Sequence, residues 1–200
     1  MTAANRLSLD EGFEVLRSRF RDPNFLACKG LGNEIPFHVF PYDASLEFEV
    51  RKRIELLVQD FSLDEDRARA IHMDLWDVFL ALCEEKRILN KLDKMERDRG
   101  REWLQTRLQS IASPGAFVST MSRLYRERYG GQQQGRDVLL ISGVGKVCPF
   151  ARAHGILENA QPIFPDIPVV LMYPGSYDGH ALKLFGTLAD GNYYRAFCLI

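Results

Sequence analysis

The chain of 200 residues is almost balanced in charge, with 26 Lys and Arg against 27 Asp and Glu and a formal net charge of −1. This balance excludes a global attraction to nucleic acid or to an anionic membrane, so any such contact needs a local patch. A length of 200 residues with 46% hydrophobic residues favours one domain with a substantial core. We expect a single domain over 1–200, with a helical insertion or subdomain at about 62–130.

The first residues and the cysteines predict a cytoplasmic protein. The opening MTAANRLSLDEGFEV lacks the basic start and the apolar stretch of a signal peptide, and no segment approaches the ~20 apolar residues of a membrane span. The four cysteines stand far apart without a C-x-x-C pair, which favours reduced thiols over a disulfide framework or a zinc site. Because the four histidines also lack metal-binding spacing, we expect no metal and no cofactor.

The first 61 residues predict two helices with one strand between them. Ser8 and Glu11 form a capping box ahead of an apolar stripe with helical spacing. The short apolar run at 35–41 predicts a strand. Asp43 then stands where an N-cap belongs, before a second amphipathic helix.

A long helical middle follows, and we expect its first helix to begin at Ser62, which forms a capping box with Glu65. The apolar residues that this helix should bury are Ile71, Leu75, Trp76, Phe79 and Leu82. The stretch 84–109 carries eight Lys or Arg against six acids. Such interspersed signs are typical of a solvated helix, which should project into solvent or bend near Gly100.

The apolar stripe resumes after this charged stretch at Trp103, Leu104 and Leu108. We expect these three residues to join the core, with a groove for a partner helix as the alternative. Ser113 and Pro114 are suitable N-cap and N1 residues for the last helix of the middle.

The last third predicts the rest of the sheet. Continuous apolar runs at 137–143 and 167–173 are typical of buried strands, and a short helix from about Pro149 to Asn159 would join them in a βαβ unit. Segments 182–188 and 193–200, joined by ADGN, predict a hairpin at one edge. The fold class that follows is α/β, with a mixed, mostly parallel central sheet flanked by helices and a helical middle segment.

The stretch VLLISGVGKVCPFARAH at 138–154 is similar to a phosphate-binding loop, but its spacing fails. A P-loop needs G-x-x-x-x-G-K-[ST], whereas Leu140 occupies the first glycine position and Val147 the hydroxyl position. The dinucleotide pattern needs its third glycine where Cys148 stands. We interpret Gly143 and Gly145 as a tight turn after a buried strand, with contact to a small anion as the alternative.

Other polar residues complete the candidate sites. The residues that could contact an anion or another ligand at the strand ends are Gly143, Gly145, Lys146, Arg152, Tyr177 and Asp178. We favour a turn role for Tyr177 and Asp178. The candidate patch for an acidic partner or a phosphate backbone comprises Arg123, Arg126, Arg128 and Arg136. Cys148 and His154 lack a third orienting residue, so we predict no catalytic residue.

The last third also resembles a specific family. Its segments GVGKVCPFARAHGILENAQPIF, PVVLMYPGSYDGHALKLFG and DGNYYRAFCLI are similar to the carboxy-terminal signature of the BrxB family of BREX bacteriophage-exclusion systems. The matching positions are Gly143, Gly145, Pro149, Phe150, Arg152, His154, Pro174, Gly175, Tyr177, Asp178, Gly179, Phe185, Gly186, Tyr193, Tyr194 and Arg195. The early PFHVFPYD segment and the total length are similar in layout.

The resemblance implies a non-enzymatic accessory protein of a BREX anti-phage defence system. It implies PglZ, a phosphatase-like protein, as the foremost partner, and the BrxC ATPase and the PglX methyltransferase as further ones. It brings no catalytic residues. The alternative hypothesis from the residues is a phosphate, nucleotide or nucleic-acid binding module that uses the Gly143–Lys146 turn.

Overall fold

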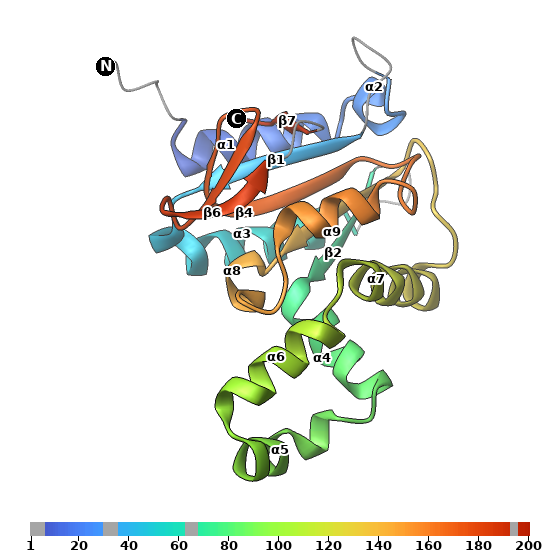
Figure 1. Cartoon of the computed structure of the whole chain (residues 1–200). Coiled ribbons are helices and arrows are strands. Elements are labelled where there is room, and N and C mark those ends of the chain that lie inside the picture. Colours follow the sequence, from blue (N-terminus) through green and yellow to red (C-terminus); the bar gives the residue numbers. More distant parts are fainter. Residues whose placement is uncertain (1–6, 30–35, 63–67, 193–195) are drawn as a thin grey trace.

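Five parallel strands form the centre of the fold, in the order β2-β3-β4-β1-β7 (Figure 1). The computed structural model describes residues 7–29, 36–62, 68–192 and 196–200. Within these ranges the strands are β1 (Phe37–Tyr42), β2 (Arg69–Asp74), β3 (Asp137–Ser142), β4 (Val169–Tyr177), β5 (Ala181–Leu184), β6 (Leu188–Asn192) and β7 (Phe197–Cys198). The predicted α/β class and the mostly parallel sheet are confirmed.

Helices cover both faces of the sheet. The first face carries α1 (Leu9–Arg19), α2 (Pro23–Leu26) and α3 (Glu47–Asp60), with a short 3-10 turn, η1 (Ala44–Leu46), before α3. The other face carries α4 (Leu75–Glu85), α7 (Pro114–Tyr129), α8 (Val144–Val147) and α9 (Ala153–Ala160). In Figure 1, α1 lies above the strands, and α7 and α8 lie below them.

Alternation along the central strands explains the two cores. In β3, Leu139 and Ile141 join the core beneath α4 and α7, whereas Val138 and Leu140 join the core beneath α1 and α3. Successive side chains of a strand point to opposite faces, so a strand buried on both sides is a continuous apolar run. All six residues of β3 are buried.

A helical arm projects away from this body. It contains the 3-10 turn η2 (Leu89–Lys91), α5 (Leu92–Arg99) and α6 (Arg101–Ile111), and it extends below the layers in Figure 1. Gly100 separates the two helices at φ +86°, which confirms the predicted bend. Leu104 and Leu108 are buried as expected, but the core prediction was wrong for Trp103, which is 41% exposed.

The prediction of a helix from Ser62 across Ile71 was wrong. Residues 69–74 form strand β2, which pairs in parallel with β3, and α4 begins only at Leu75. Asp74 is the N-cap of α4. Glu65 lies outside the described residues. The spacing of Ile71 and Leu75 suits a helix, but the two residues belong to different elements that bury them in one core.

The carboxy-terminal hairpin differs from the predicted one. β5 pairs with β6, and the chain reverses at Phe185 and Gly186, whose φ angles are +54° and +73°. The ADGN segment, predicted as the turn, therefore lies within β6. Of the predicted strand 193–200, residues 193–195 lie outside the described ranges, and β7 pairs with β1 at the far edge of the parallel sheet.

The predicted βαβ unit is present, with two short helices in place of one. β3 and β4 are parallel neighbours, and α8 and α9 connect them. The glycine turn enters α8 at Val144 rather than a helix at Pro149. None of the described helices is long and apolar enough to cross a membrane.

Candidate functional site at the carboxyl ends of the strands

The carboxyl ends of β1 to β4 share one edge of the sheet, which is where open α/β sheets usually bind ligands. Asp74 ends β2 and lies directly opposite Ser142, the last residue of β3. Beneath them, His72 Nε2 lies 2.7 Å from Ser142 Oγ, and burial lowers the pKa of His72. The turn from Gly143 to Lys146 therefore begins beside Asp74.

Asp74 binds both the helix that follows it and the lysine of the turn. One carboxylate oxygen accepts a hydrogen bond from the backbone N–H of Trp76 at 2.8 Å, as an N-cap does. The other oxygen accepts a hydrogen bond from Lys146 Nζ in an ion pair. The side chain of Asp74 is only 11% exposed and that of Lys146 only 27%. An anion at this turn would have to compete with Asp74 for the ammonium group.

Gly143 allows the turn to approach Asp74 closely. Its φ of +79° is in the left-handed region, and a Cβ at this position would lie 2.3 Å from Asp74 Oδ1 and 3.2 Å from the backbone nitrogen of Leu75. Both facts favour the tight-turn interpretation of this glycine. Anion binding by the turn stays a prediction.

The tip of the β5–β6 hairpin lies against the same turn. A Cβ on Gly145 would lie 3.0 Å from two ring carbons of Phe185 and 3.6 Å from Pro174 Cγ. Phe185 itself stays 45% exposed. The turn is therefore covered in part by an aromatic ring of the same chain.

Arg152 and His154 converge on a second acidic residue, Asp190 of β6, which is buried and only 1% exposed. Asp190 Oδ2 accepts hydrogen bonds from the backbone N–H of Ala153 and from the Tyr173 hydroxyl, both at 3.3 Å. Arg152 Nη1 lies 3.9 Å from Asp190 Oδ1, and His154 Nδ1 lies 2.5 Å from the backbone oxygen of Asp190. Burial raises the pKa of Asp190. This cluster joins the hairpin to α9.

Cys148 and His154 are not joined by a hydrogen bond in the described part of the chain. The Nδ1 atom of His154 is used by the backbone of Asp190, as described above. Across the described ranges, no three His, Cys, Asp or Glu side chains are grouped as metal ligands would be.

Tyr177 and Asp178 form the turn between β4 and β5. The Asp178 carboxylate accepts hydrogen bonds from the backbone N–H groups of Ala181 (2.7 Å) and His180 (2.9 Å), which lower its pKa. The Tyr177 hydroxyl lies 2.9 Å from the backbone oxygen of Ala196 and 3.1 Å from that of Gly179. These contacts are those of a side-chain-supported turn.

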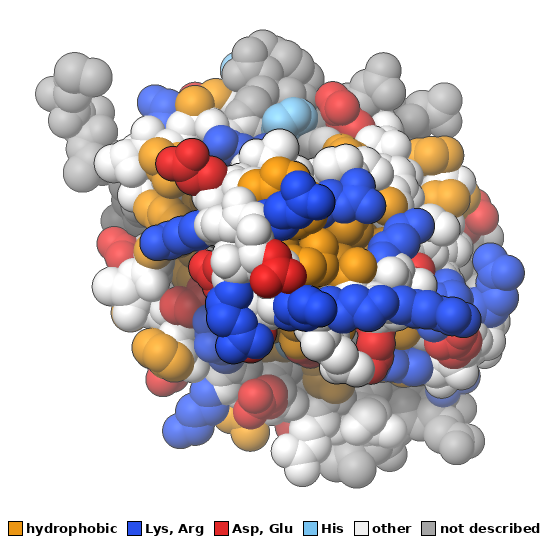
Figure 2. Space-filling view, turned by 60° about the horizontal axis from the view of Figure 1, so that its bottom comes forward, with side chains coloured by type: hydrophobic (Ala, Val, Ile, Leu, Met, Phe, Trp, Pro, Cys, Tyr) orange, Lys and Arg blue, Asp and Glu red, His pale blue; other side chains and the backbone are white. Residues whose placement is uncertain are grey.

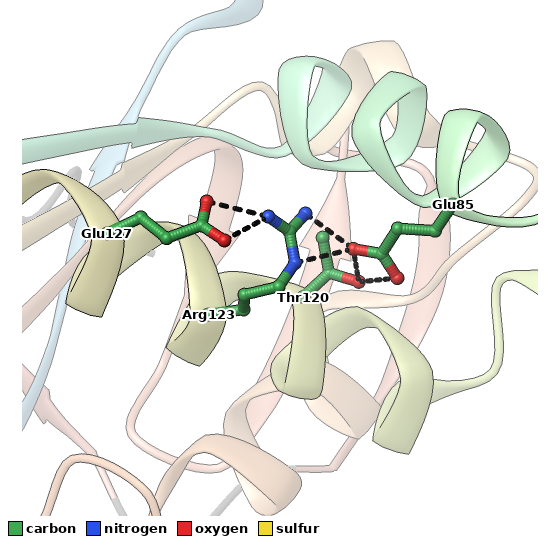
Figure 3. A network of polar contacts seen from close by, with 4 residues as sticks. All are labelled: Glu85, Thr120, Arg123 and Glu127. Carbon is green, nitrogen blue, oxygen red and sulfur yellow. Dashed lines mark hydrogen bonds and ion pairs between the residues drawn. The ribbon is translucent and has the colours of Figure 1, made fainter.

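Arg123, in the predicted arginine patch, is held between two carboxylates (Figure 3). Its Nη1 donates to both oxygens of Glu127 at 2.7 and 2.8 Å, and its Nη2 and Nε donate to Glu85 at 2.6 and 3.0 Å. Thr120 also donates to Glu85. The two acids raise the pKa of Arg123. Glu85, which sequence analysis did not pair with Arg123, neutralises part of this patch.

The other members of the patch are not joined in one network. Arg126 and Arg128 are exposed on α7, whereas Arg136 precedes β3 and donates a hydrogen bond to Gln133 at 3.1 Å. A groove of about 690 Å³ runs along α7 and the end of α9. Residues that line it include Gly115, Ser119, Ser122, Arg123, Arg126 and Asn159.

Comparisons with the sequences of known proteins place this chain in a family. The sequence profile of the family described as BREX protein BrxB matches residues 71–199. A BREX protein BrxB of Bacillus cereus (strain H3081.97) is 34% identical over 192 residues, which cover 96% of this chain and 97% of that protein. The chain belongs to the BrxB family. A BREX protein BrxB of Escherichia coli O9:H4 (strain HS) is 25% identical over 96% of this chain and 92% of its own length. No solved structure matches.

Membership of the BrxB family confirms the resemblance of the carboxy-terminal third. The chain is therefore a component of an antiviral BREX system and acts with other BREX components. Among the signature positions, Tyr193, Tyr194 and Arg195 lie outside the described residues. The structure adds Asp74 and Asp190, which sequence analysis missed. Asp74 could have been found as an N-cap before Leu75, whereas no local signal marks Asp190 as buried.

Proposed function

We propose that this BrxB-family protein is a non-enzymatic adaptor that organises other BREX proteins through protein contacts. PglZ is the foremost proposed partner, and the BrxC ATPase and the PglX methyltransferase are the further ones. Membership of the BrxB family supports a role within the BREX system.

The observation that carries this proposal is that the candidate polar groups at the strand ends form ion pairs and hydrogen bonds within the chain itself. Lys146 is engaged by Asp74, and Asp190 engages Arg152 and, through its backbone, His154. The Asp178 carboxylate is held by the amides of its own turn. These side chains stabilise the junctions between elements, which supports work by surface contact rather than by turnover.

Separate binding measurements with each BREX protein test the adaptor role. We expect the purified chain to retain PglZ in a pull-down at moderate salt, because a specific interface combines a desolvated centre with a polar rim. An unrelated protein of similar charge carrying the same tag is the control. Failure of PglZ, BrxC and PglX alike to bind the chain would rule the adaptor out.

Alanine at Cys148 and at His154 tests the non-enzymatic part. We expect each variant to keep phage defence within a small factor of wild type, because neither side chain is proposed to react. Plating efficiency of a sensitive phage is the measurement, with expression and thermal stability checked in parallel. A variant that folds normally and binds PglZ normally but abolishes defence would point to chemistry at this site instead.

A further inference from the structure

The helical arm concentrates positive charge in a chain that is otherwise slightly acidic. Between residues 86 and 107, which we name the basic arm, the sequence has eight Lys or Arg and four acids, a surplus of four positive charges. The whole chain carries −1. The basic arm extends from the body in Figure 1, and Figure 2 turns that end toward the reader. Lys and Arg side chains there border an apolar area.

Most of these cations are not neutralised by the described part of the chain. Arg97 pairs with Asp93 at 2.8 Å, and Arg99 lies over the Trp103 ring at 5.6 Å. The exposed cations that form no ion pair with a described residue are Lys86, Arg87, Lys91, Lys94, Arg101 and Arg107. Positive and negative residues alternate along this part of the sequence, but most of its cations do not form ion pairs with described residues.

The basic arm also displays apolar surface that stays partly open to solvent. Trp103 is 41% exposed, and Leu92 and Met95 are only partly buried. No residue of α5 is buried. Leu104 of α6 ties the arm to the core, so the apolar surface that stays exposed lies on α5 and at Trp103. Trp and Arg are the residue types enriched in binding hot spots.

We propose that the basic arm docks this protein on an acidic surface of a partner protein, with Trp103 as the apolar anchor and the unpaired cations around it. This inference rests on the proposed adaptor function and names the surface that performs it. A protein partner fits better than nucleic acid because the arm combines its cations with the exposed ring of Trp103, and a protein interface offers a desolvated pocket for such an anchor. Trp and Arg are enriched in protein interfaces, and polar side chains surround the apolar centre.

Two variants of the full chain test the docking surface by calorimetry against purified PglZ, BrxC and PglX in turn. We expect Trp103→Ala to raise the dissociation constant of the complex at least about tenfold, as the loss of a hot-spot residue does. A second variant combines Lys94→Glu, Arg101→Glu and Arg107→Glu. It should weaken binding by a similar factor at low salt and by less at high salt, because salt screens exposed charges.

Matched controls lie on other faces. Phe48, which is 81% exposed on α3, is the control for Trp103 as Phe48→Ala. The charge control combines Arg21→Glu, Lys29→Glu and Lys52→Glu, all at exposed positions outside the basic arm. Both controls should bind like wild type. Thermal melting checks folding, and if Trp103→Ala unfolds, the charge variant alone decides.

Each outcome decides between the two proposals. If wild type binds a BREX protein and both arm variants bind it equally well, the docking surface is rejected and the adaptor function stands. If wild type binds none of the three proteins, both are rejected. If the arm variants lose binding to short duplex DNA but keep PglZ, the surface is a nucleic-acid interface and our assignment is wrong.

Discussion

Gly175→Ala should lower the free energy of unfolding by about 3 kcal/mol, because overpacking a site that cannot relax costs this much. Gly175 lies where β4 leaves the parallel sheet and pairs with Leu184 of β5. An added Cβ would lie 2.1 Å from the backbone oxygen of Lys183 and 3.0 Å from Tyr173 Cε1. The nearest atom is a carbonyl within a strand pair, so the clash cannot be relieved by rotating a side chain.

The hairpin should move as a unit in this variant. Separation of β5 from β4 exposes Leu182 and Leu184, which are each 1% exposed, and withdraws Asp190 from α9. Urea unfolding of wild type and variant measures the difference. Gly131→Ala is the matched control, since nothing lies within 4 Å of its Cβ position. Equal midpoints for Gly175→Ala and Gly131→Ala would show that β4 and β5 are not packed as described.

The sequence predicted those elements whose signals are local. β3 and β4 were predictable because both faces of each strand are buried, which leaves a continuous apolar run. The bend at Gly100 was predictable because the neighbouring residues are polar and glycine tolerates a positive φ. β2 was missed because its six residues include Ile71, which continues a helical spacing to Leu75. Only the pairing with β3, far along the chain, makes that segment a strand.

The candidate site was predictable as a location but not as a set of contacts. The glycines at 143 and 145 marked a turn at the carboxyl end of a strand. The partner of Lys146, however, is Asp74, which is 72 positions away, and the partner of Arg123 is Glu85, 38 positions away. Sequence spacing carries no information about such pairs. The sequence-based prediction therefore overestimated how much positive charge in the arginine patch is free of ion pairs.

Asp190→Ala should cost about 1–3 kcal/mol of stability, because removing the carboxylate leaves buried groups without a partner. The groups affected are the backbone N–H of Ala153 and the hydroxyl of Tyr173. Asp190→Asn keeps an acceptor for both groups and is the matched control. We expect the asparagine variant to be at least as stable as wild type at neutral pH, because it places no charge in this buried site.

The direction in which the stability of the wild type changes with pH follows from the pKa of Asp190. Burial raises the pKa of Asp190 above the 3.8 of an ordinary Asp side chain, so the folded state binds a proton that the unfolded state has released. The contribution of Asp190 to stability is therefore fully present below pH 3.8 and is lost as pH rises through the folded-state pKa. Asp190→Asn lacks this ionisation, so the stability gap in its favour should widen with rising pH across that window.

Urea unfolding of both chains in steps from about pH 4 to pH 7 measures the gap. A gap that stays constant would mean that Asp190 does not change its protonation on folding. A gap that narrows with rising pH would mean that Arg152, 3.9 Å from Oδ1, favours the carboxylate more than burial disfavours it. In the second case the ion pair with Arg152 would contribute to the joint between the hairpin and α9.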